Sequence, residues 1–511
     1  MQLIRNILVT LSLFLSFGME AKTSTTPERY LLSRSTIRHG LREKTTYVVK
    51  NNINLRNADL IIPEGCIIDF AGGRILNGRI HFCNTYLSGD ICFQKVSPSG
   101  VIINQNVSSS WFSNSVDCLD WLCSLPSKNV DFCNHEYEIE SSLKLSKGSS
   151  YRNLNVRVVG KGCPSVIVFN GTEKSYPQKL DAANISLTNV SIDANKKSAN
   201  GIAFYYSDTI TIESCHIMNS MSRDDSQVVN GIYLFHCDNI YINSCNIEGI
   251  ISDKTDLYPR GITMVTCHRS VIENSDISKI GDNKECHGDG IQIAVEDSHA
   301  LTDVGNNSIL KTTISDCRYR LLKLQQRGIV VDSCSLITRD KAIQQEQSAI
   351  SVYNSDMVIR NSYILSLASI PINLGVSNSA LSHISNIRII NNRIENNSSS
   401  YIGSIHTSNS SRNCMLSDIT VEDNYLIDKS IDHRNVGVSI RNVAMRYSIV
   451  GNTFEGFDCV LEVRDKYMPD DGFVDSVTMN KNILRSNKNV FRKLVDNKKR
   501  MDITISDNKN E

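Results

Sequence analysis

The segment from Gly201 to Ala294 repeats one short phrase, a glycine followed by alternating apolar residues. The copies read Gly201-Ile-Ala-Phe-Tyr, Gly231-Ile-Tyr-Leu-Phe, Gly261-Ile-Thr-Met-Val and Gly290-Ile-Gln-Ile-Ala, at spacings of 30, 30 and 29 residues. Related phrases without the glycine begin at Leu321 and Ala349. A fixed period of this length is typical of repeat architectures, so the stacking of successive units decides the fold.

A second phrase follows each copy and has the form apolar-x-x-[Cys/Ser/Asn]-x-apolar, as in Ile212–Ile217 and Ile242–Ile247. It recurs towards the end of the chain, for example at Met479–Leu484. Alternating apolar residues between Asn, Asp, Ser and Gly indicate strands with one buried face. Such units are too short for the four antiparallel strands of a propeller blade. We therefore predict an all-β, single-stranded parallel β-helix of about twelve coils, each stacked on the next.

The fourth position of the second phrase forms a predicted column of small polar residues. It reads Val190, Cys215, Cys245, Ser275, Cys317, Cys334, Ser362, Asn392, Asn424, Asn452, Asn482 and Asn508. We interpret it as an internal ladder whose cysteines are buried and reduced. Cys215–Cys245 and Cys237–Cys267 disulfides remain an alternative. No Cys-x-x-Cys pair or zinc-type spacing occurs, so no structural metal site is expected.

The chain is divided by pattern into four parts. Residues 1–21 have a basic start and a short apolar run, which predicts an export signal. Residues 22–108 form a β-rich N-terminal subdomain, either separate or continuing the stack. Residues 109–180 hold entry coils and a capping helix, indicated by helical spacing between Trp111 and Leu125. Residues 181–511 are the β-helix.

Composition excludes several classes of protein. Fifty-four Lys and Arg balance fifty-four Asp and Glu, so no global positive field attracts nucleic acid or an anionic membrane. Nine prolines and 21% charged residues argue against a disordered chain. No run after the signal approaches about 18 apolar residues, so no stable membrane insertion is expected. The oligomeric state is not determined by the sequence.

Three phrases carry a family resemblance: Val190-Ser-Ile-Asp-Ala-Asn, Asn230-Gly-Ile-Tyr-Leu and Gly288-Asp-Gly-Ile-Gln-Ile. They resemble the pectin-lyase-like superfamily of right-handed β-helices, over roughly residues 110–510. Residues 117–162 also resemble a degenerate entry module of pectate-lyase-3 and tailspike-type proteins. The resemblance implies right-handed coiling and cleavage of acidic polysaccharides. The export signal predicts a protein of the periplasm, cell surface or medium.

Alignment on the phrase start turns the repeats into columns. We call the first residue of each phrase, such as Gly261 or Gly290, the anchor. The position after the anchor, such as Ile262 or Ile291, is predicted to face the interior. The position before it and the second and fourth positions after it are predicted to face outwards. These columns bring together, on an exposed face, Arg260, Asp289, Arg320, Gln292, Lys323 and Gln325. The same face carries aromatic walls at Tyr205, Tyr233, Phe235 and Tyr353.

We expect this patch to bind a uronate-containing polysaccharide or oligosaccharide, because aromatic rings cover sugar faces and cations hold carboxylates. Cleavage by β-elimination needs a base and a cation that neutralises the carboxylate. Lys323 is the predicted base, its pKa lowered by the arginines; Arg320 grips a carboxylate and Asp289 orients the cations. The expected substrate contacts are Arg260, Gln292, Gln325, Tyr233, Phe235, His287, Asp225 and Glu285.

Alternatives remain open. Polygalacturonase-like hydrolysis needs two carboxylates; here Asp289 keeps the register of the family's Asp-Asp phrase, while Arg260 and Arg320 replace its other acid and its histidine. Asp225, Asp256 or Glu285 from loops would have to supply the missing acid. No cofactor is expected, although calcium in a loop stays compatible. A non-catalytic carbohydrate-binding or adhesive rod, or an exposed charge ladder of little energetic weight, explains the same residues.

Overall fold

The computed structural model describes most of the chain. The described ranges are 28–113, 115–173, 180, 182–222, 228–253, 258–281, 288–296, 302–338, 348–367, 370–375, 381–398, 403–407, 415–465, 468–469, 472–495 and 499–511. They form parts of two compact units, Met1–Asn104 and Gln105–Glu511. None of the helices in these ranges is both long and apolar enough to cross a bilayer.

The first unit is itself a stack of parallel strands. β2 pairs β5 and β5 pairs β6, while β4 and β7 pair β6 on another face, all in parallel. Its elements are β1 (Arg29–Leu31), α2 (Arg34–Arg38), β2 (Thr46–Val49), β3 (Ile53–Asn54), β4 (Asp59–Ile62), β5 (Ile67–Phe70), β6 (Ile75–Gly89) and β7 (Phe93–Ile102).

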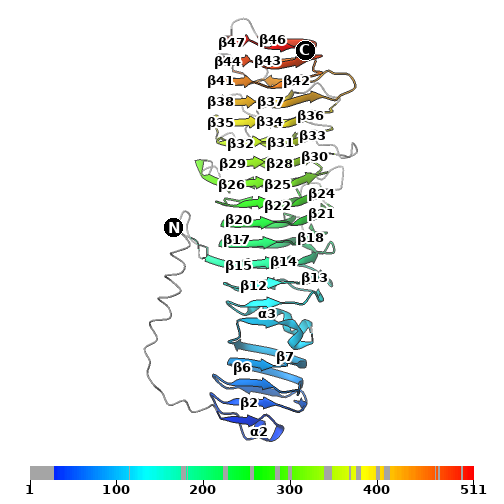
Figure 1. Ribbon diagram of the computed structural model, residues 1–511, viewed down its shortest axis with the longest axis vertical. Helices are drawn as coiled ribbons and strands as arrows, with labels where there is room; N and C mark the ends of the chain where they lie inside the picture. The colour runs from blue at the N-terminus through cyan, green and yellow to red at the C-terminus, as the bar shows by residue number, and fades with distance from the viewer. Residues whose placement is uncertain are drawn as a thin grey trace, which may run out of the picture. The chain divides into compact units, whose positions relative to one another are not determined.

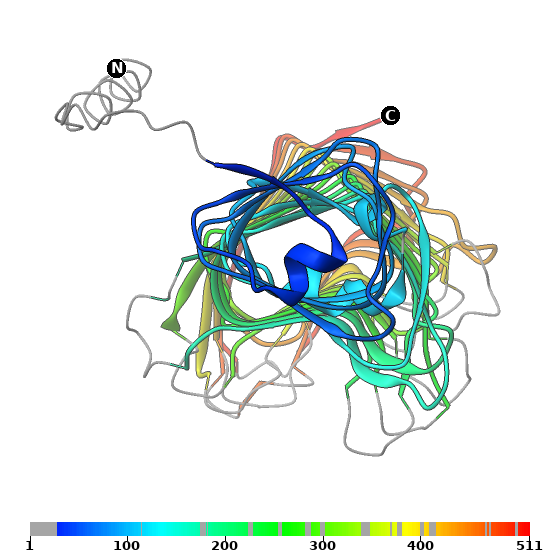
Figure 2. The same ribbon diagram turned by 90° about the horizontal axis from the view of Figure 1, so that it is seen from below.

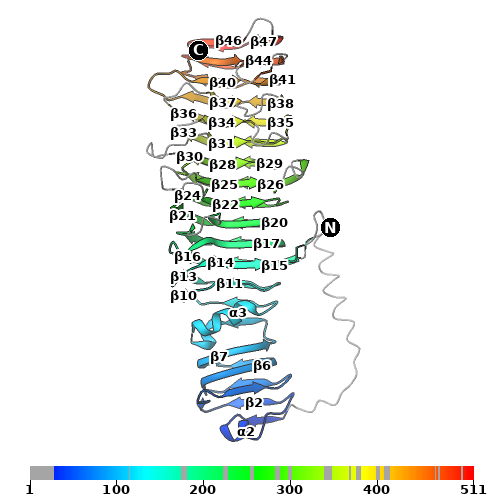
Figure 3. The same ribbon diagram turned by 180° about the vertical axis from the view of Figure 1, so that it is seen from behind.

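The second unit winds through three parallel faces, and Figures 1 and 3 show its strands one above another. The first face consists of β11 (Leu143–Lys144), β14 (Cys163–Asn170), β17 (Ser198–Glu213), β20 (Asn230–Asn243), β22 (Arg260–Val265), β25 (Asp289–Ala294), β28 (Arg320–Leu324), β31 (Ser348–Val352), β34 (Ile370–Leu374), β37 (Gly403–Thr407), β40 (Val436–Ile440), β43 (Cys459–Arg464) and β46 (Asn489–Leu494).

The second face is joined to the first because β17 and β20 run through both. Its other strands are β8 (Asn106–Ser108), β9 (Asn129–Asp131), β12 (Ser150–Arg152), β15 (Ala182–Thr188), β23 (Val271–Glu273), β26 (Val304–Leu310), β29 (Arg327–Asp332), β32 (Met357–Arg360), β35 (His383–Ile390), β38 (Met415–Glu422), β41 (Val443–Val450), β44 (Val474–Asn480) and β47 (Met501–Ser506).

The third face forms a sheet of its own, and the view in Figure 2 shows the chain coiling through the faces. Its strands are β10 (Glu136–Ile139), β13 (Asn155–Val158), β16 (Ser191–Asp193), β18 (His216–Met218), β19 (Met221–Ser222), β21 (Asn246–Ser252), β24 (Asp276–Ile280), β27 (Thr313–Ser315), β30 (Ser335–Ile337), β33 (Tyr363–Ser366), β36 (Arg393–Asn396), β39 (Tyr425–Asp428), β42 (Thr453–Glu455), β45 (Ile483–Arg485) and β48 (Lys509–Asn510).

The register predicted from the repeat is confirmed. Arg260 pairs Asp289, and Asp289 pairs Arg320, on β22, β25 and β28. The position after each anchor is interior, and Ile262 and Ile291 are fully buried. Glycine is needed at the anchor because coils approach closely there: a Cβ at Gly261 would lie 2.5 Å from Ile277 Cγ2 and 2.6 Å from the backbone oxygen of Gly290. The parallel β-helix is therefore the fold of the second unit.

The internal ladder is also present, with one correction. Asn392, Asn424, Asn452 and Asn482 each donate a side-chain hydrogen bond to the next asparagine along, ending on Asn508, at 2.8–3.1 Å. Between Ser275 and Cys334, however, the column holds Thr312 rather than Cys317, since the amide of Ser275 donates to Thr312 Oγ1 and Thr313 pairs Ser335.

Cys317 is the fourth residue of a phrase of the same form, Ile314–Tyr319, which predicts a place in the ladder, but its side chain packs at the corner beside Gly290. The cysteines of the ladder and both members of the Cys237–Cys267 pair are buried free thiols. Cys215 Sγ and Cys245 Sγ instead donate to backbone oxygens of Leu187 and Ile212. The reduced-ladder prediction is confirmed and the disulfide alternative is not.

A short helix lies where helical spacing predicts one. It is α3 (Leu119–Ser124), preceded by the 3-10 turns η1 (Ser109–Phe112) and η2 (Val116–Cys118). Leu119, Trp121, Leu122 and Cys123 are its buried residues. Its capping role remains a prediction.

Candidate functional site

Two polar columns of the first face lie close together on either side of the anchor. The anchor and the residue after it both face the interior, so the residues before and two after the anchor lie on one outer side. Thr263 Oγ1 donates to Asn230 Oδ1 at 2.6 Å, and Ser348 Oγ lies 2.6 Å from Ser351 Oγ, each bond joining these two columns. On the coils of β22, β25 and β28, the same two columns hold Arg260, Asp289, Gln292, Arg320 and Lys323. We call these five residues the basic cluster.

An ion pair forms the centre of the basic cluster. Arg320 Nη1 lies 3.5 Å from Asp289 Oδ1, and these side chains are only 8% and 2% exposed. The Arg320 guanidinium carbon lies 4.2 Å from the ring centroid of Tyr319 and 5.8 Å from that of Tyr353, both within cation–π range. The pair is thus held rigidly and away from water.

Among the described residues, the cluster contains buried polar atoms of Arg260 and Gln292 that have no hydrogen-bond partner. They are Arg260 Nε and Gln292 Oε1. The amide nitrogen of Gln292 is used, donating to Gln325 Oε1 at 2.8 Å. A buried unpaired donor and acceptor each cost free energy unless a bound group satisfies them, which makes this place a candidate site for a polar ligand.

Electrostatics favour an anionic ligand. Burial lowers the pKa of Lys323 to about 8; Asp289 opposes this, while Arg320 and Arg260 add to it. Burial also lowers the pKa of Arg260, against the attraction of Asp289. Three cationic side chains therefore share one described carboxylate, and an added negative charge relieves their repulsion.

Aromatic rings border the basic cluster on the earlier coils. The Tyr205 and Tyr233 centroids are 5.6 Å apart, and those of Tyr233 and Phe235 are 6.3 Å apart with nearly parallel planes. Burial raises the pKa of Tyr233 to about 12, so its hydroxyl stays protonated at neutral pH. The predicted aromatic wall is present beside the cations.

The predicted exposure of this face is wrong. Asp289 is 1% exposed and Gln292 and Arg320 are 7% exposed, and the rings of Tyr319 and Tyr353 lie against Arg320. The sequence analysis did not predict Tyr319 as part of this site. Tyr319 immediately precedes the column residue Arg320, and the repeat does not encode the position of its ring against the Arg320 guanidinium. Of the loop residues expected to contact substrate, Asp225, Glu285 and His287 lie outside the described residues, as does Asp256.

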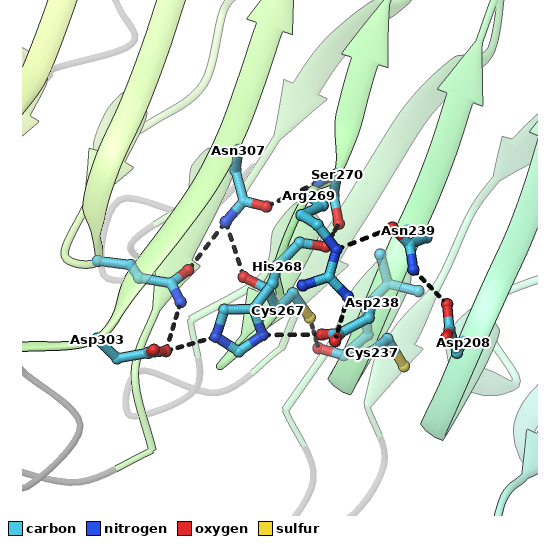
Figure 4. Close-up of polar contacts among 12 residues, drawn as sticks. Asp208, Cys237, Asp238, Asn239, Cys267, His268, Arg269, Ser270, Asp303 and Asn307 are labelled. Carbon is cyan, nitrogen blue, oxygen red and sulfur yellow. Dashed lines mark hydrogen bonds and ion pairs between the residues drawn. The ribbon is translucent and has the colours of Figure 1, made fainter. Parts of the chain in front are cut away.

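A second polar cluster lies at the corner after β22, and Figure 4 shows it. His268 bridges two carboxylates, with Nδ1 2.8 Å from Asp238 Oδ1 and Nε2 2.6 Å from Asp303 Oδ2. Arg269 donates to the other oxygen of Asp238 at 2.9 Å, and Gln326 donates to Asp303 at 3.1 Å. The histidine side chain is only 12% exposed. This arrangement holds the start of β26 against the preceding coil.

The bridge predicts a pH-dependent stability. Burial alone would lower the pKa of His268, but the hydrogen bonds to Asp238 and Asp303 outweigh it and raise the pKa. A histidine whose pKa is raised by folding stabilises the protein fully below its unfolded-state pKa of about 6.5. This stabilisation is lost as the pH rises through the folded-state pKa. Asp238 acts oppositely: despite desolvation, its bonds to His268 and Arg269 lower its pKa, so its contribution is lost in acid.

We expect His268→Gln to destabilise the protein by about 2 kcal/mol at pH 5.5 and by less at pH 9. Urea unfolding midpoints measured at both values give the difference. His135→Gln, a change of an exposed histidine elsewhere in the second unit, is the matched control. An equal loss at both pH values would show that the charge on His268 contributes nothing.

Metal ligation has no support in this part of the molecule. Across the described ranges, no group of three or more His, Cys, Asp and Glu side chains is placed to hold a metal ion. Calcium in a loop remains a prediction.

Comparison with known proteins gives the class to which this fold corresponds. Residues 178–364 match a family model described as a right handed beta helix region, so the coils are right-handed, as the resemblance implied. No curated protein sequence matches the chain.

Solved structures with similar coiling are distant in sequence. A surface adhesin of Streptococcus pneumoniae is 12% identical over 73% of this chain and 85% of its own, with a TM-score of 0.45. A tailspike of Pseudomonas phage phi297 is 12% identical over 71% of each chain, with a TM-score of 0.44. An alginate lyase of a Paenibacillus species is 14% identical over 63% and 96%, with a TM-score of 0.36.

Proposed function

We propose that the basic cluster binds the carboxylate groups of a uronate-containing polysaccharide and cleaves the chain by β-elimination. The observation that carries this proposal is the shielded excess of positive charge around a lysine whose pKa is lowered to about 8. Desolvated cations bind carboxylates strongly, and an amine that loses its proton near neutral pH is suited to act as a base.

In the proposed reaction the neutral amine of Lys323 removes the proton on the carbon next to the uronate carboxylate. The electron pair of that C–H bond forms a carbon–carbon double bond, and the bond from the adjacent carbon to the glycosidic oxygen breaks. The leaving oxygen takes a proton from solvent. Arg260 and Arg320 neutralise the carboxylate as negative charge develops on it, which lowers the barrier, while Asp289 holds Arg320 in place.

The surroundings are suited to sugar rings. Tyr233 and Phe235 present aromatic surface beside the cations, and such rings pack against the apolar faces of sugars. Gln292 Oε1 and Arg260 Nε supply an acceptor and a donor that the described residues leave unused. A bound uronate hydroxyl and carboxylate would satisfy both atoms.

Hydrolysis fits this cluster less well. Asp289 is committed to Arg320, and a hydrolase needs a second carboxylate on the other side of the bond. The residues suggested for that role, Asp225, Asp256 and Glu285, lie outside the described residues. Product analysis distinguishes hydrolysis and simple binding from the elimination.

The assay compares products across a panel of acidic and neutral polysaccharides. We expect polyuronates to give unsaturated products that absorb in the near ultraviolet, with new reducing ends in equal number. Reducing ends without that absorbance would indicate a hydrolase, and retention on immobilised polyuronate without either product would indicate a binding protein. Both outcomes would overturn the elimination.

The proposed substrate is found outside cells, which agrees with the export signal expected in residues 1–21. That segment lies outside the described residues, so export to the periplasm, surface or medium remains a proposal. Fractionation of cells expressing the full chain tests it.

A further inference from the structure

A hollow of about 420 Å³ lies on the second unit, away from the basic cluster. Its polar lining comes from paired positions on β8, β9 and β12, where Asn106 pairs Asn129 and Ser108 pairs Asp131. Val107 and Val130 line it as well, and Trp111 from the turn η1 completes it. The volume lies within the range of about 300–1,000 Å³ found for small-molecule sites.

Trp111 is positioned as an aromatic platform. It is only partly buried, whereas the next residue, Phe112, is buried and packs edge-on against Trp121 with centroids 5.3 Å apart. The turn itself is capped by Ser108, whose hydroxyl accepts from the amide of Ser110. An indole that stays accessible on a fixed turn provides a surface on which a sugar ring can stack.

The polar groups of the hollow are ordered before any ligand arrives. Asp131 accepts from Arg152 Nε at 3.0 Å, Asn153 Nδ2 at 3.0 Å and the amide of Cys133 at 2.9 Å. These bonds outweigh desolvation and lower the pKa of Asp131, so it remains an ionised acceptor. Asn129 Nδ2 donates to Asn106 Oδ1 at 2.9 Å, which leaves Asn106 Nδ2 and Asn129 Oδ1 outside that bond.

The charge of the hollow distinguishes it from the basic cluster. Asp131 and Arg152 are its charged lining residues and form an ion pair, so its lining is neutral overall. β26 follows β25 in the same coil as Asp289, so it marks the level of the basic cluster. Six strand steps of about 4.8 Å separate β9 from β26, which places the two sites about 29 Å apart along the unit. The two places can therefore be occupied independently.

We propose that this hollow binds a neutral pyranose unit of a glycan, stacked on Trp111 with its hydroxyls bonded to Asp131, Asn106 and Asn129. The site is an accessory one: it holds a carbohydrate without cleaving it and does not depend on the proposed elimination.

Tryptophan fluorescence tests this directly, because the chain contains two tryptophans. Trp121 is 8% exposed, so Trp121→Phe leaves the platform as the single reporter. Neutral hexasaccharides of glucose, mannose and galactose, and a uronate hexamer, are titrated into the full chain. We expect at least one neutral hexamer to change the emission saturably, and binding measured calorimetrically to weaken about tenfold in Trp111→Ala.

Asn129→Ala, which leaves the turn unchanged, should weaken the same binding, and Lys323→Met should not affect it. The proposal is wrong if no neutral hexamer binds, if the uronate hexamer alone binds, or if both Trp111→Ala and Asn129→Ala bind like the wild type. Because Lys323→Met removes only the basic cluster's base, failure of the proposed elimination leaves this result unchanged.

Discussion

Replacement of Lys323 by arginine should lower cleavage of polyuronate by about 10³-fold, because a general base contributes about 10²–10⁴-fold and a guanidinium does not deprotonate at ordinary pH. Binding should persist, since the positive charge is kept. In the wild type, kcat/KM should rise tenfold per pH unit and level off above about pH 8, where burial places the Lys323 pKa. The measurement is the initial rate of near-ultraviolet absorbance across pH, with affinity from calorimetry.

Lys311→Met is the matched control, because this lysine is exposed and paired with Glu273 on another part of the coil. It should leave both the rate and the pH profile unchanged. A Lys323→Arg enzyme that still cleaves at a comparable rate, or a wild-type profile that is flat between pH 6 and 9, would rule out Lys323 as the base.

Replacement of Asn424 by alanine should destabilise the second unit by about 3 kcal/mol. Asn424 Oδ1 accepts from both the amide and the side chain of Asn392, and Asn424 Nδ2 donates to Asn452 Oδ1 and to the backbone oxygen of Ile389. Truncation leaves several buried groups unpaired, at about 1–3 kcal/mol for each that water cannot reach. Urea unfolding followed by circular dichroism measures the loss.

Asn489→Ala provides the comparison, because Asn489 also donates a side-chain hydrogen bond, to the backbone oxygen of Asp458 at 2.9 Å, but on the exposed surface. Its removal should cost less than about 1 kcal/mol, since water replaces the lost partner. Equal losses in the two variants would mean that burial of the asparagine ladder adds no stability.

The period of the repeat was sufficient to predict much of this molecule. Residues about thirty apart become vertical neighbours, so the column of Arg260, Asp289 and Arg320 followed from spacing alone and is confirmed by strand pairing. Spacing failed where two phrases overlapped. Cys317 fits the pattern, whereas Thr312 has the same apolar spacing around it but is not Cys, Ser or Asn; pairing of Thr313 with Ser335 nevertheless places Thr312 in the column.

Burial of the basic cluster was not predictable in the same way. The repeat places side chains on a face, but it does not say what covers them. The shielding of Arg320 depends on the rings of Tyr319 and Tyr353, one of which precedes the aligned columns. The hollow beside Trp111 was not predictable for a related reason, because it combines neighbouring strands with a turn that lies outside the regular period.

Duplication or loss of a coil would have different consequences in different parts of the chain. Each coil contacts mainly the one before and the one after, so adding or losing a whole coil among the later asparagine-bearing turns would change the length by one step and preserve the remaining register. A coil inserted between β22 and β28 would instead separate Arg260 or Arg320 from Asp289. Lineages of this protein are therefore expected to vary in length on the C-terminal side of the charged turns and to keep those three turns consecutive.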